Sequence, residues 1–311
     1  RDDKEVVLEA IKQYGYCLKY ASSKLKKDKK VVLEALKKNV FSLMYADESL
    51  RNDKKFIINA LKHCNWGTFF EFVGDELKKD KEVVLQAVKQ WGMALQFANK
   101  NLKRDKKIVI TAVKQYCNSL EHADNELKKD PEIVIEAIKQ NGYAFQYADE
   151  SLKKDRNFII KAVKISGNVL SYVDKKFKKD KEIVLEAVKA SGYTLQYLDD
   201  SLKKDKEIVL AAVKQDGSVL EFADDIFKKD KEIVLAAVKQ DGFALQYADD
   251  IFKKDKEIVL EGAKNRGGAL EFADDSFKKD KEIVLAAVKQ DGGALQYADD
   301  IFKKDKEIVL E

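Results

Sequence analysis

The chain repeats one pattern of apolar and polar positions along its whole length. An aspartate that precedes a run of apolar residues returns regularly, at Asp3, Asp28, Asp53, Asp80, Asp105, Asp130, Asp155, Asp180, Asp205, Asp230, Asp255, Asp280 and Asp305. The interval is 25 residues throughout, except for 27 residues between Asp53 and Asp80. A fixed period of this length is typical of repeat architectures. We therefore predict a single tandem-repeat array over residues 1–311, with twelve full units and a truncated thirteenth.

Within a unit we count positions from this aspartate. The consensus is D-K-E-I-V-L-A-A-V-K-Q-x-G-x-A-L-Q-Y-A-D-D-x-F/L-K-K. Positions 4, 5, 6, 8 and 9 are apolar, which predicts a helix that is packed on two sides. Aspartate at position 1 is a typical helix N-cap. Pro131 directly follows Asp130 and suits the first turn of a helix.

Position 13 predicts where this first helix ends. It is glycine in ten of the twelve full units, and a glycine after a helix usually adopts the left-handed conformation. Val40 and Cys117 replace it in two units, so those turns are expected to close differently or to carry strain. The two extra residues of the third unit, in HCNWG before Gly67, are expected to lie in a turn.

A second, shorter helix is expected over the A-L-Q-Y-A segment. The residue at position 23, always leucine or phenylalanine in a full unit, is expected to anchor the segment that returns to the next cap. One such unit cannot bury its apolar face alone, whereas stacked units bury it between them. The predicted fold class is therefore all-α: an elongated α-solenoid of about twelve 25-residue helical-hairpin repeats, extending about 100–120 Å. Residues 1–179 contain diverged units and residues 180–311 near-uniform ones.

Charge is high but mixed in sign. Charged residues make up 37% of the chain, which suits an elongated shape with much surface, yet the net charge is only +4. Residues 1–79 carry 17 basic and 12 acidic side chains, and the remainder 42 and 43. Because lysines alternate with acids and form no concentrated basic stripe, nucleic acid is an unlikely partner. The alternative function is binding to nucleic acid or another anionic surface through the basic N-terminal units.

The cysteines and the hydropathy of the chain indicate in which cellular compartment the protein is expected. Cys17, Cys64 and Cys117 are odd in number and lack a metal or redox spacing, which favours a reducing compartment such as the cytoplasm, or a virion, over a disulfide-forming secretory route. No apolar run approaches the roughly 20 residues of a membrane span. Because the sequence starts at Arg1 and stops within a unit, we expect it to be a piece of a longer protein.

The residues KDKEIVLAAVKQDGFALQYADD resemble a short helical repeat family catalogued as domain of unknown function 4116. The shared pattern is D-x-E-[IV]-V-x-x-A-[VI]-x-x-x-G-x-A-L-x-[YF]-A. Units one, four, six and eight to twelve match it well, units two, five and seven match in part, and unit three carries the insertion. The resemblance implies a repeat scaffold without established chemistry, in giant viruses, protists or intracellular bacteria.

Residues that could carry chemistry have simpler interpretations. His122 takes the aromatic position 18 and is expected to fill a packing slot, and the row of tyrosines and phenylalanines there is expected to pack more than to stack bases. His63 and Cys64 are adjacent in a turn, a poor arrangement for a nucleophile and its base. Aspartate pairs such as Asp224–Asp225 precede lysines and indicate caps and surface charges more than calcium ligands. No catalytic, cofactor or metal residues are predicted.

Positions 12 and 14 vary while the surrounding frame stays fixed. Turn tips of a solenoid align along one edge, and in the N-terminal half this edge is predicted to carry six apolar side chains: Tyr14, Tyr16, Trp66, Trp91, Met93 and Tyr116. Exposed aromatics favour protein contacts, and relaxed constraint at a loop tip is the alternative. We expect a non-enzymatic interaction scaffold or structural spacer, within a viral or host-associated assembly, which binds protein partners or itself.

Overall fold

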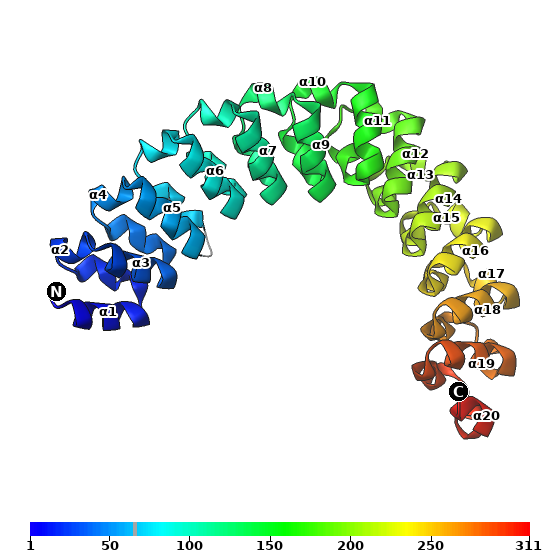
Figure 1. Ribbon diagram of the computed structural model, residues 1–311. Coiled ribbons are helices and arrows are strands. Elements are labelled where there is room, and N and C mark those ends of the chain that lie inside the picture. Colours follow the sequence, from blue (N-terminus) through cyan, green and yellow to red (C-terminus); the bar gives the residue numbers. More distant parts are fainter. Residues whose placement is uncertain (65–66) are drawn as a thin grey trace. The chain divides into compact units, whose positions relative to one another are not determined.

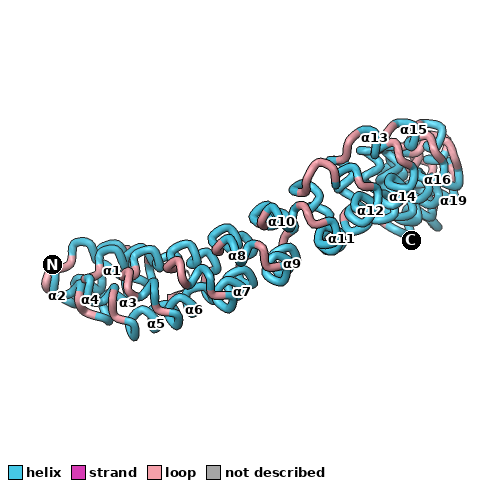
Figure 2. Tube along the Cα trace, turned by 90° about the horizontal axis from the view of Figure 1, so that it is seen from above, coloured by secondary structure: helices cyan, strands magenta, loops and turns pink. Residues whose placement is uncertain are grey.

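The computed structural model describes residues 1–64 and 67–311. These residues form helices and connecting turns, with no strand among them (Figures 1 and 2). The chain divides into two compact units, residues 1–152 and 153–311. This division by contacts does not coincide with the change in sequence uniformity after residue 179, because packing and divergence are different properties. No helix of the described part has the length and apolarity to cross a membrane.

Each repeat begins with a long α-helix over positions 2–11. In residues 1–152 these helices are α1 (Lys4–Gln13), α3 (Lys29–Lys38), α5 (Lys54–His63), α6 (Lys81–Gln90), α7 (Lys106–Gln115) and α9 (Pro131–Gln140). In residues 153–311 they are α11 (Arg156–Ile165), α12 (Lys181–Ala190), α14 (Lys206–Gln215), α16 (Lys231–Gln240), α18 (Lys256–Asn265), α19 (Lys281–Gln290) and the shorter α20 (Lys306–Val309). Within each compact unit, consecutive long helices pack side by side, so the predicted α-helical repeat solenoid is confirmed.

The second helix of each repeat is a 3₁₀ helix over positions 13–18. These helices are η1 (Gly15–Tyr20), η2 (Val40–Tyr45), η3 (Gly67–Phe72), η5 (Gly92–Phe97), η7 (Cys117–His122), η8 (Gly142–Tyr147), η9 (Gly167–Tyr172), η11 (Gly192–Tyr197), η12 (Gly217–Phe222), η13 (Gly242–Tyr247), η14 (Gly267–Phe272) and η16 (Gly292–Tyr297). Six residues is long for this tight helix. Most of them pack against their own long helix and that of the next repeat, as η5 does against α6 and α7, which supports them from both sides.

The return segment forms a further helix of about one turn, which the sequence pattern described only as an anchored connection. It is α2 (Ser23–Lys26), α4 (Glu48–Arg51), η4 (Leu77–Lys79), η6 (Leu102–Arg104), α8 (Asn125–Lys128), α10 (Glu150–Lys153), η10 (Phe177–Lys179), α13 (Asp200–Lys203), α15 (Asp225–Lys228), α17 (Asp250–Lys253), η15 (Phe277–Lys279) or η17 (Phe302–Lys304). The leucine or phenylalanine at position 23 is the anchor; Phe227 and Phe252, for example, are buried.

The predicted caps and core positions are confirmed. The side chain of Asp28 accepts hydrogen bonds from the N–H groups of Lys30 and Val31, at 3.0 and 3.1 Å, and each of the other position-1 aspartates caps its helix in the same way. Pro131 is the first residue of α9. From α3 to α19, positions 4, 5, 8 and 9 are buried in the long helices; in α16 they are Ile233, Val234, Ala237 and Val238, which are fully buried. In the terminal helices, which have a neighbour on one side only, Val6 of α1 and Val309 of α20 are exposed.

The expected left-handed glycine is wrong, because no described residue has a positive φ. Glycine at position 13 is needed for a different reason: the backbone of the next repeat lies against it. A Cβ on Gly242 would lie 2.5 Å from the carbonyl oxygen of Gly262, and one on Gly15 would lie 2.5 Å from that of Ala35. Such contacts are closer than real Cβ atoms show, so the absent side chain lets neighbouring repeats approach.

The expected special closure at Val40 and Cys117 is wrong for the same reason. The residues before them, Asn39 and Tyr116, have the extended dihedrals found before the glycines, with φ of −150° and −155°. Because no left-handed conformation is required, a side chain at this position causes no backbone strain. At Cys117 the neighbouring Gln140 instead donates to the Val113 carbonyl, at 2.6 Å.

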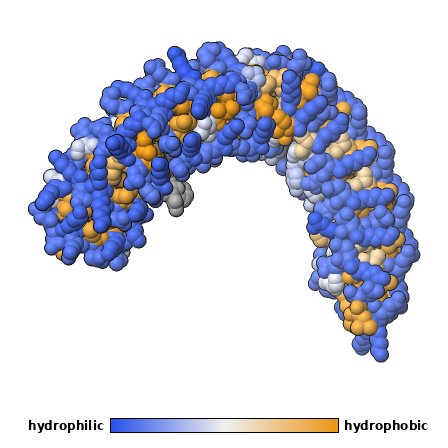
Figure 3. All heavy atoms as spheres, viewed as in Figure 1, coloured by the Kyte–Doolittle hydropathy of each residue, from blue (hydrophilic) through white to orange (hydrophobic). Residues whose placement is uncertain are grey.

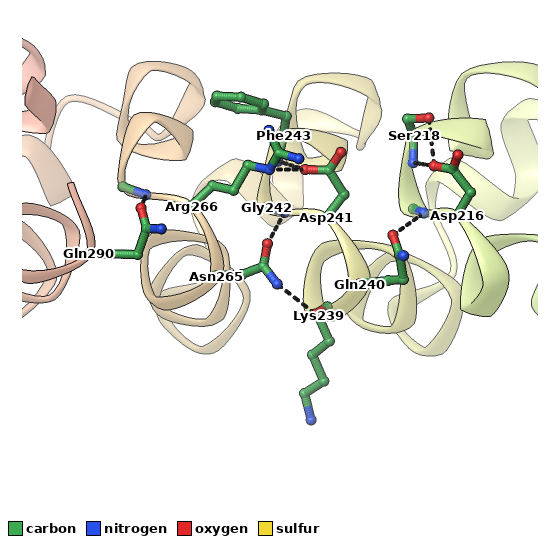
Figure 4. A network of polar contacts seen from close by, with 12 residues as sticks. Asp216, Ser218, Lys239, Gln240, Asp241, Gly242, Phe243, Asn265, Arg266 and Gln290 are labelled. Carbon is green, nitrogen blue, oxygen red and sulfur yellow. Dashed lines mark hydrogen bonds and ion pairs between the residues drawn. The ribbon is translucent and has the colours of Figure 1, made fainter.

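Polar ladders join successive repeats within each compact unit. The lysine at position 2 pairs with the cap aspartate and often with the position-3 glutamate of the next repeat, as Lys206 does with Asp230 and Glu232, at 2.7 and 2.9 Å. The amide at position 11 accepts from the position-13 N–H of the preceding repeat, as Asn265 does from Gly242, at 2.8 Å (Figure 4). Exposed ion pairs contribute about 0–1 kcal/mol each, so the ladders matter through repetition.

Candidate protein-contact site

The residue at position 12 joins the long helix to the 3₁₀ helix. Where it is asparagine or aspartate, its side chain accepts the N–H of position 14 and caps the 3₁₀ helix. Asn39 accepts from Phe41 at 3.0 Å. Asp216 accepts from Ser218 and Asp241 from Phe243, at 3.0 and 3.1 Å (Figure 4). Variation at this position is therefore partly structural, because an acid or amide here has a capping role.

Three of the predicted contact residues occupy this capping position without capping. Tyr14, Trp91 and Tyr116 precede η1, η5 and η7, and none makes a side-chain cap hydrogen bond. Ser166, Ser191 and Arg266 also leave the cap unmade, so a cap is not obligatory. The absence of a cap lowers the free energy of unfolding by about 0.5–2 kcal/mol. An aromatic side chain that stays exposed to water makes no local contacts that offset this loss.

The structure places these side chains in local clusters on the turn edge of residues 1–152. Tyr14 and Tyr16 are 63% and 46% exposed, and their ring centroids are 6.0 Å apart. Trp91 is half-buried with its ring 6.2 Å from that of Phe97. Tyr116 is 45% exposed, and its hydroxyl accepts from Asn118 at 3.3 Å.

The remaining two predicted contact residues give less support. Met93 is half-buried. Trp66 lies outside the described residues. The structure therefore supports an exposed pair of rings at Tyr14 and Tyr16 and a single exposed ring at Tyr116, with Trp91 partly covered between them in the order of the repeats. In the view of Figure 3, hydrophilic side chains cover most of the visible surface of the repeats.

The aromatic row at position 18 packs as predicted. Aromatic rings at position 14 of one repeat meet rings at position 18 of the next: Phe41 meets Phe72 and Phe243 meets Phe272, with centroids 6.2 and 6.1 Å apart. Edge-to-face and tilted pairs of this kind stabilise a surface. Most of these rings are half-buried and engaged, which leaves few faces free to stack on bases.

A period of two repeats is present in the sequence but was missed. Position 17 is glutamate in most odd-numbered repeats and glutamine in most even-numbered ones, with tyrosine following in the even ones. The two positions interact across the repeats: burial and the Glu221 carboxylate of the preceding repeat raise the pKa of Tyr247, and burial and Glu121 raise that of Tyr147. Large side chains at position 14 of even repeats, such as Phe41, Tyr193 and Phe243, follow the same alternation.

Titratable residues elsewhere show packing roles. Burial lowers the pKa of His122, which fills its aromatic slot as predicted. Burial raises the pKa of the Cys64 thiol to about 11, so it stays protonated at neutral pH and is a poor nucleophile. His63 beside it is exposed.

The aspartate pairs serve as predicted caps and surface charges. Asp224 caps α15 by accepting the Ile226 N–H at 3.1 Å, and Asp225 pairs with Lys228 at 2.9 Å. Throughout residues 1–64 and 67–311, no cluster of three histidines, cysteines or acids could hold a metal.

Comparison with known families gives one consistent match. A family model described as a domain of unknown function (DUF4116) matches residues 3–51, 31–78, 53–103, 80–128, 105–153, 130–178, 155–203, 180–228, 230–278, 255–302 and 280–311. Most matches span about two of the 25-residue repeats, and most successive matches overlap by about one repeat. No curated protein and no solved structure matches the chain.

Proposed function

The chain belongs to the family of the domain of unknown function DUF4116 over nearly its whole length, and from its surface we propose that it is a non-enzymatic protein-interaction scaffold. The diverged repeats of residues 1–152 carry the contact surface. The near-uniform repeats act as a spacer within a larger assembly, viral or host-associated. The observation that carries this proposal is the aromatic residue at a capping position in three repeats.

Stability alone does not favour these aromatics. Asp216 and Asp241 show that a short polar side chain fits position 12 and caps the following helix. Tyr14 and Tyr116 instead leave that N–H without a side-chain cap and expose a large apolar ring to water. Tyrosine and tryptophan dominate the binding energy of protein interfaces because they bury a large area with few rotamers. A partner that covers the rings provides the stabilisation that the lone repeat lacks.

Charge supports a protein partner over a nucleic acid. Lysines at position 2 of the N-terminal repeats are held by acids: Lys4 pairs with Asp28, and Lys54 with Asp80 and Glu82, at 2.5–2.9 Å. Paired lysines release few counterions on meeting a phosphate backbone, which is the main source of affinity for nucleic acids. Residues 1–79 carry a net positive charge, so binding to an anionic partner is the alternative that the experiment must distinguish from protein binding.

The test replaces the aromatic side chains by the residue that caps the uniform repeats. A triple variant Tyr14→Asp, Trp91→Asp and Tyr116→Asp removes the aromatic surface and adds caps, so its fold should be at least as stable as that of the parent. The matched control is Asp216→Asn with Asp241→Asn, which keeps the caps in the uniform repeats. Partners captured from native extract are identified, purified and then measured against each variant.

The expected result is a salt-tolerant partner that binds the parent and the control and loses at least tenfold in affinity for the triple variant. Equal affinity for the triple variant contradicts the proposed edge. A partner whose affinity falls steeply between low and high salt, and which survives the triple substitution, instead supports anionic binding.

A further inference from the structure

The return segment of the eighth repeat lacks a hydrogen bond that joins most repeats. In the tenth and eleventh repeats the N–H at position 20 donates to the carbonyl at position 24 of the preceding repeat: Asp249 to Lys228 and Asp274 to Lys253, both at 3.0 Å. Among the described residues, no such bond joins Asp199 to Lys178 in the eighth repeat or Asp224 to Lys203 in the ninth. The backbone donor of Asp199 and acceptor of Lys178 are thus left facing an opening between the repeats.

Two substitutions distinguish this opening. Leu198 occupies position 19, where most repeats have alanine, and its larger side chain is buried there. Ser171 replaces the glutamate that odd repeats usually supply at position 17. Without that carboxylate, Tyr197 of the eighth repeat is 64% exposed, whereas Tyr247, which has its glutamate, is half-buried.

A cavity of about 240 Å³ lies at this opening. Its lining includes Leu170, Ser171, Lys178, Tyr197, Leu198 and Asp199. The Lys178 ammonium donates to the Ser171 carbonyl at 2.7 Å, which fixes a cation at the rim. The volume lies below the roughly 300–1,000 Å³ of pockets for drug-sized ligands, which suits a short segment better than a cofactor.

The Asp199 carboxylate differs from the aspartates at the same position of the next two repeats, which are hydrogen-bonded and paired with a lysine. In the ninth and tenth repeats Asp224 and Asp249 each cap the return helix and pair with a lysine of the preceding repeat. Asp199 makes neither a cap bond nor an ion pair among the described residues. The cavity therefore presents a backbone donor, a backbone acceptor, a cation and an anion beside an exposed aromatic ring.

We propose that this cavity binds a short peptide segment of a partner protein through its main-chain amides. A peptide amide carries one donor and one acceptor. It can therefore accept from the Asp199 N–H and donate to the Lys178 carbonyl, and so bridge the two groups that are not bonded to each other. Recognition of an extended segment by unpaired backbone groups is an established binding mode. The exposed Tyr197 ring covers the side chain of the bound segment. This site lies in residues 153–311 and does not depend on the aromatic edge.

The test uses the whole 311-residue chain labelled with ¹⁵N-aspartate. The probe is N-acetyl-dialanine methylamide, and its ester analogue, which lacks the central N–H, is the matched ligand control. We expect a saturable shift of the Asp199 amide signal with a dissociation constant of about 1 mM, and no shift for Asp249, whose N–H is already bonded. The ester should bind at least fivefold more weakly.

The closing variant combines Leu198→Ala with Ser171→Glu, which restores the residues of the other repeats. It should remove the saturable shift while circular dichroism stays unchanged. Ser171→Gln alone, which fills the rim with a neutral side chain, provides a second variant that leaves the core untouched and should weaken binding. An Asp199 signal that does not saturate up to the solubility limit of the peptide overturns the proposal, as does equal binding of the ester or of the closing variant.

Discussion

Gly242 offers the sharpest test of how the repeats are held together. A methyl group added there would lie 2.5 Å from the carbonyl oxygen of Gly262 and 3.0 Å from the backbone nitrogen of Arg266, both in the next repeat. Neither contact can be relieved by rotating a side chain, because both atoms belong to the backbone. The two repeats must separate, and the hydrogen bond from Gly242 N–H to Asn265 is lost with them.

The cost of Gly242→Ala follows from these two effects. Overpacking in a close-packed site costs about 1–3 kcal/mol, and the lost hydrogen bond about 0.5–1.5 kcal/mol. The sum is about 2–4 kcal/mol. Gly292 is the matched control, because a Cβ there meets no atom within 4 Å and its φ is not in the left-handed region. Gly292→Ala should therefore be neutral or stabilise by up to about 1 kcal/mol, since alanine restricts the unfolded chain.

Urea denaturation followed by circular dichroism gives the overall effect of each change. Repeat arrays unfold by nearest-neighbour terms, so amide hydrogen exchange in α16 and α18 should show the loss where it occurs. The Gly242→Ala protein should exchange faster in these helices, and the Gly292→Ala protein should not. Equal stability of the two variants would refute the close-approach explanation of position 13.

Three further perturbations have definite expected outcomes. Ser119 is buried and its Oγ has no hydrogen-bond partner among the described residues, so Ser119→Ala should stabilise the protein by about 1–2 kcal/mol; a lower denaturation midpoint would contradict this. Burial lowers the pKa of His122 from 6.5, so stability is complete above that value and falls as the pH drops below it; His122→Phe should flatten this part of the profile of Tm against pH, and an unchanged profile would refute it. Asp230→Ala removes a helix cap and should cost about 1–2 kcal/mol at neutral pH. Burial opposes ionisation of Asp230, but Lys206 and the Ile233 N–H outweigh it and lower its pKa below 3.8, so the difference from the parent should shrink as the pH falls through the folded pKa; a difference that stays constant in acid would contradict this.

The sequence was sufficient for features that depend on one repeat alone. The cap aspartates, Pro131 at the start of a helix and the buried positions follow from local chemistry and periodicity, and all were predicted. Position 13 shows the limit: the conserved-looking glycine suggested a backbone conformation, whereas the reason lies in the neighbouring repeat, which a local pattern does not represent. The expected strain at Val40 and Cys117 was wrong on the same account.

The candidate site was predicted in part. Exposure of Tyr14, Tyr16 and Tyr116 at the turn edge followed from the solenoid, but the partial burial of Trp91 depends on its contact with Phe97, which spacing does not show. The capping role of position 12 was also missed, although the asparagines and aspartates there were a usable signal. The cavity at the eighth repeat is formed by residues of two repeats beside a missing hydrogen bond, and such a feature emerges only when the repeats are stacked.

Because glutamate and tyrosine alternate between successive repeats, odd-numbered and even-numbered repeats are of two different kinds. Deleting one 25-residue unit brings two repeats of the same kind together, so a tyrosine loses its carboxylate or a carboxylate its tyrosine. Deleting two units restores the original succession. We therefore expect a change in length by an even number of units to preserve these contacts and a change by an odd number to break at least one of them.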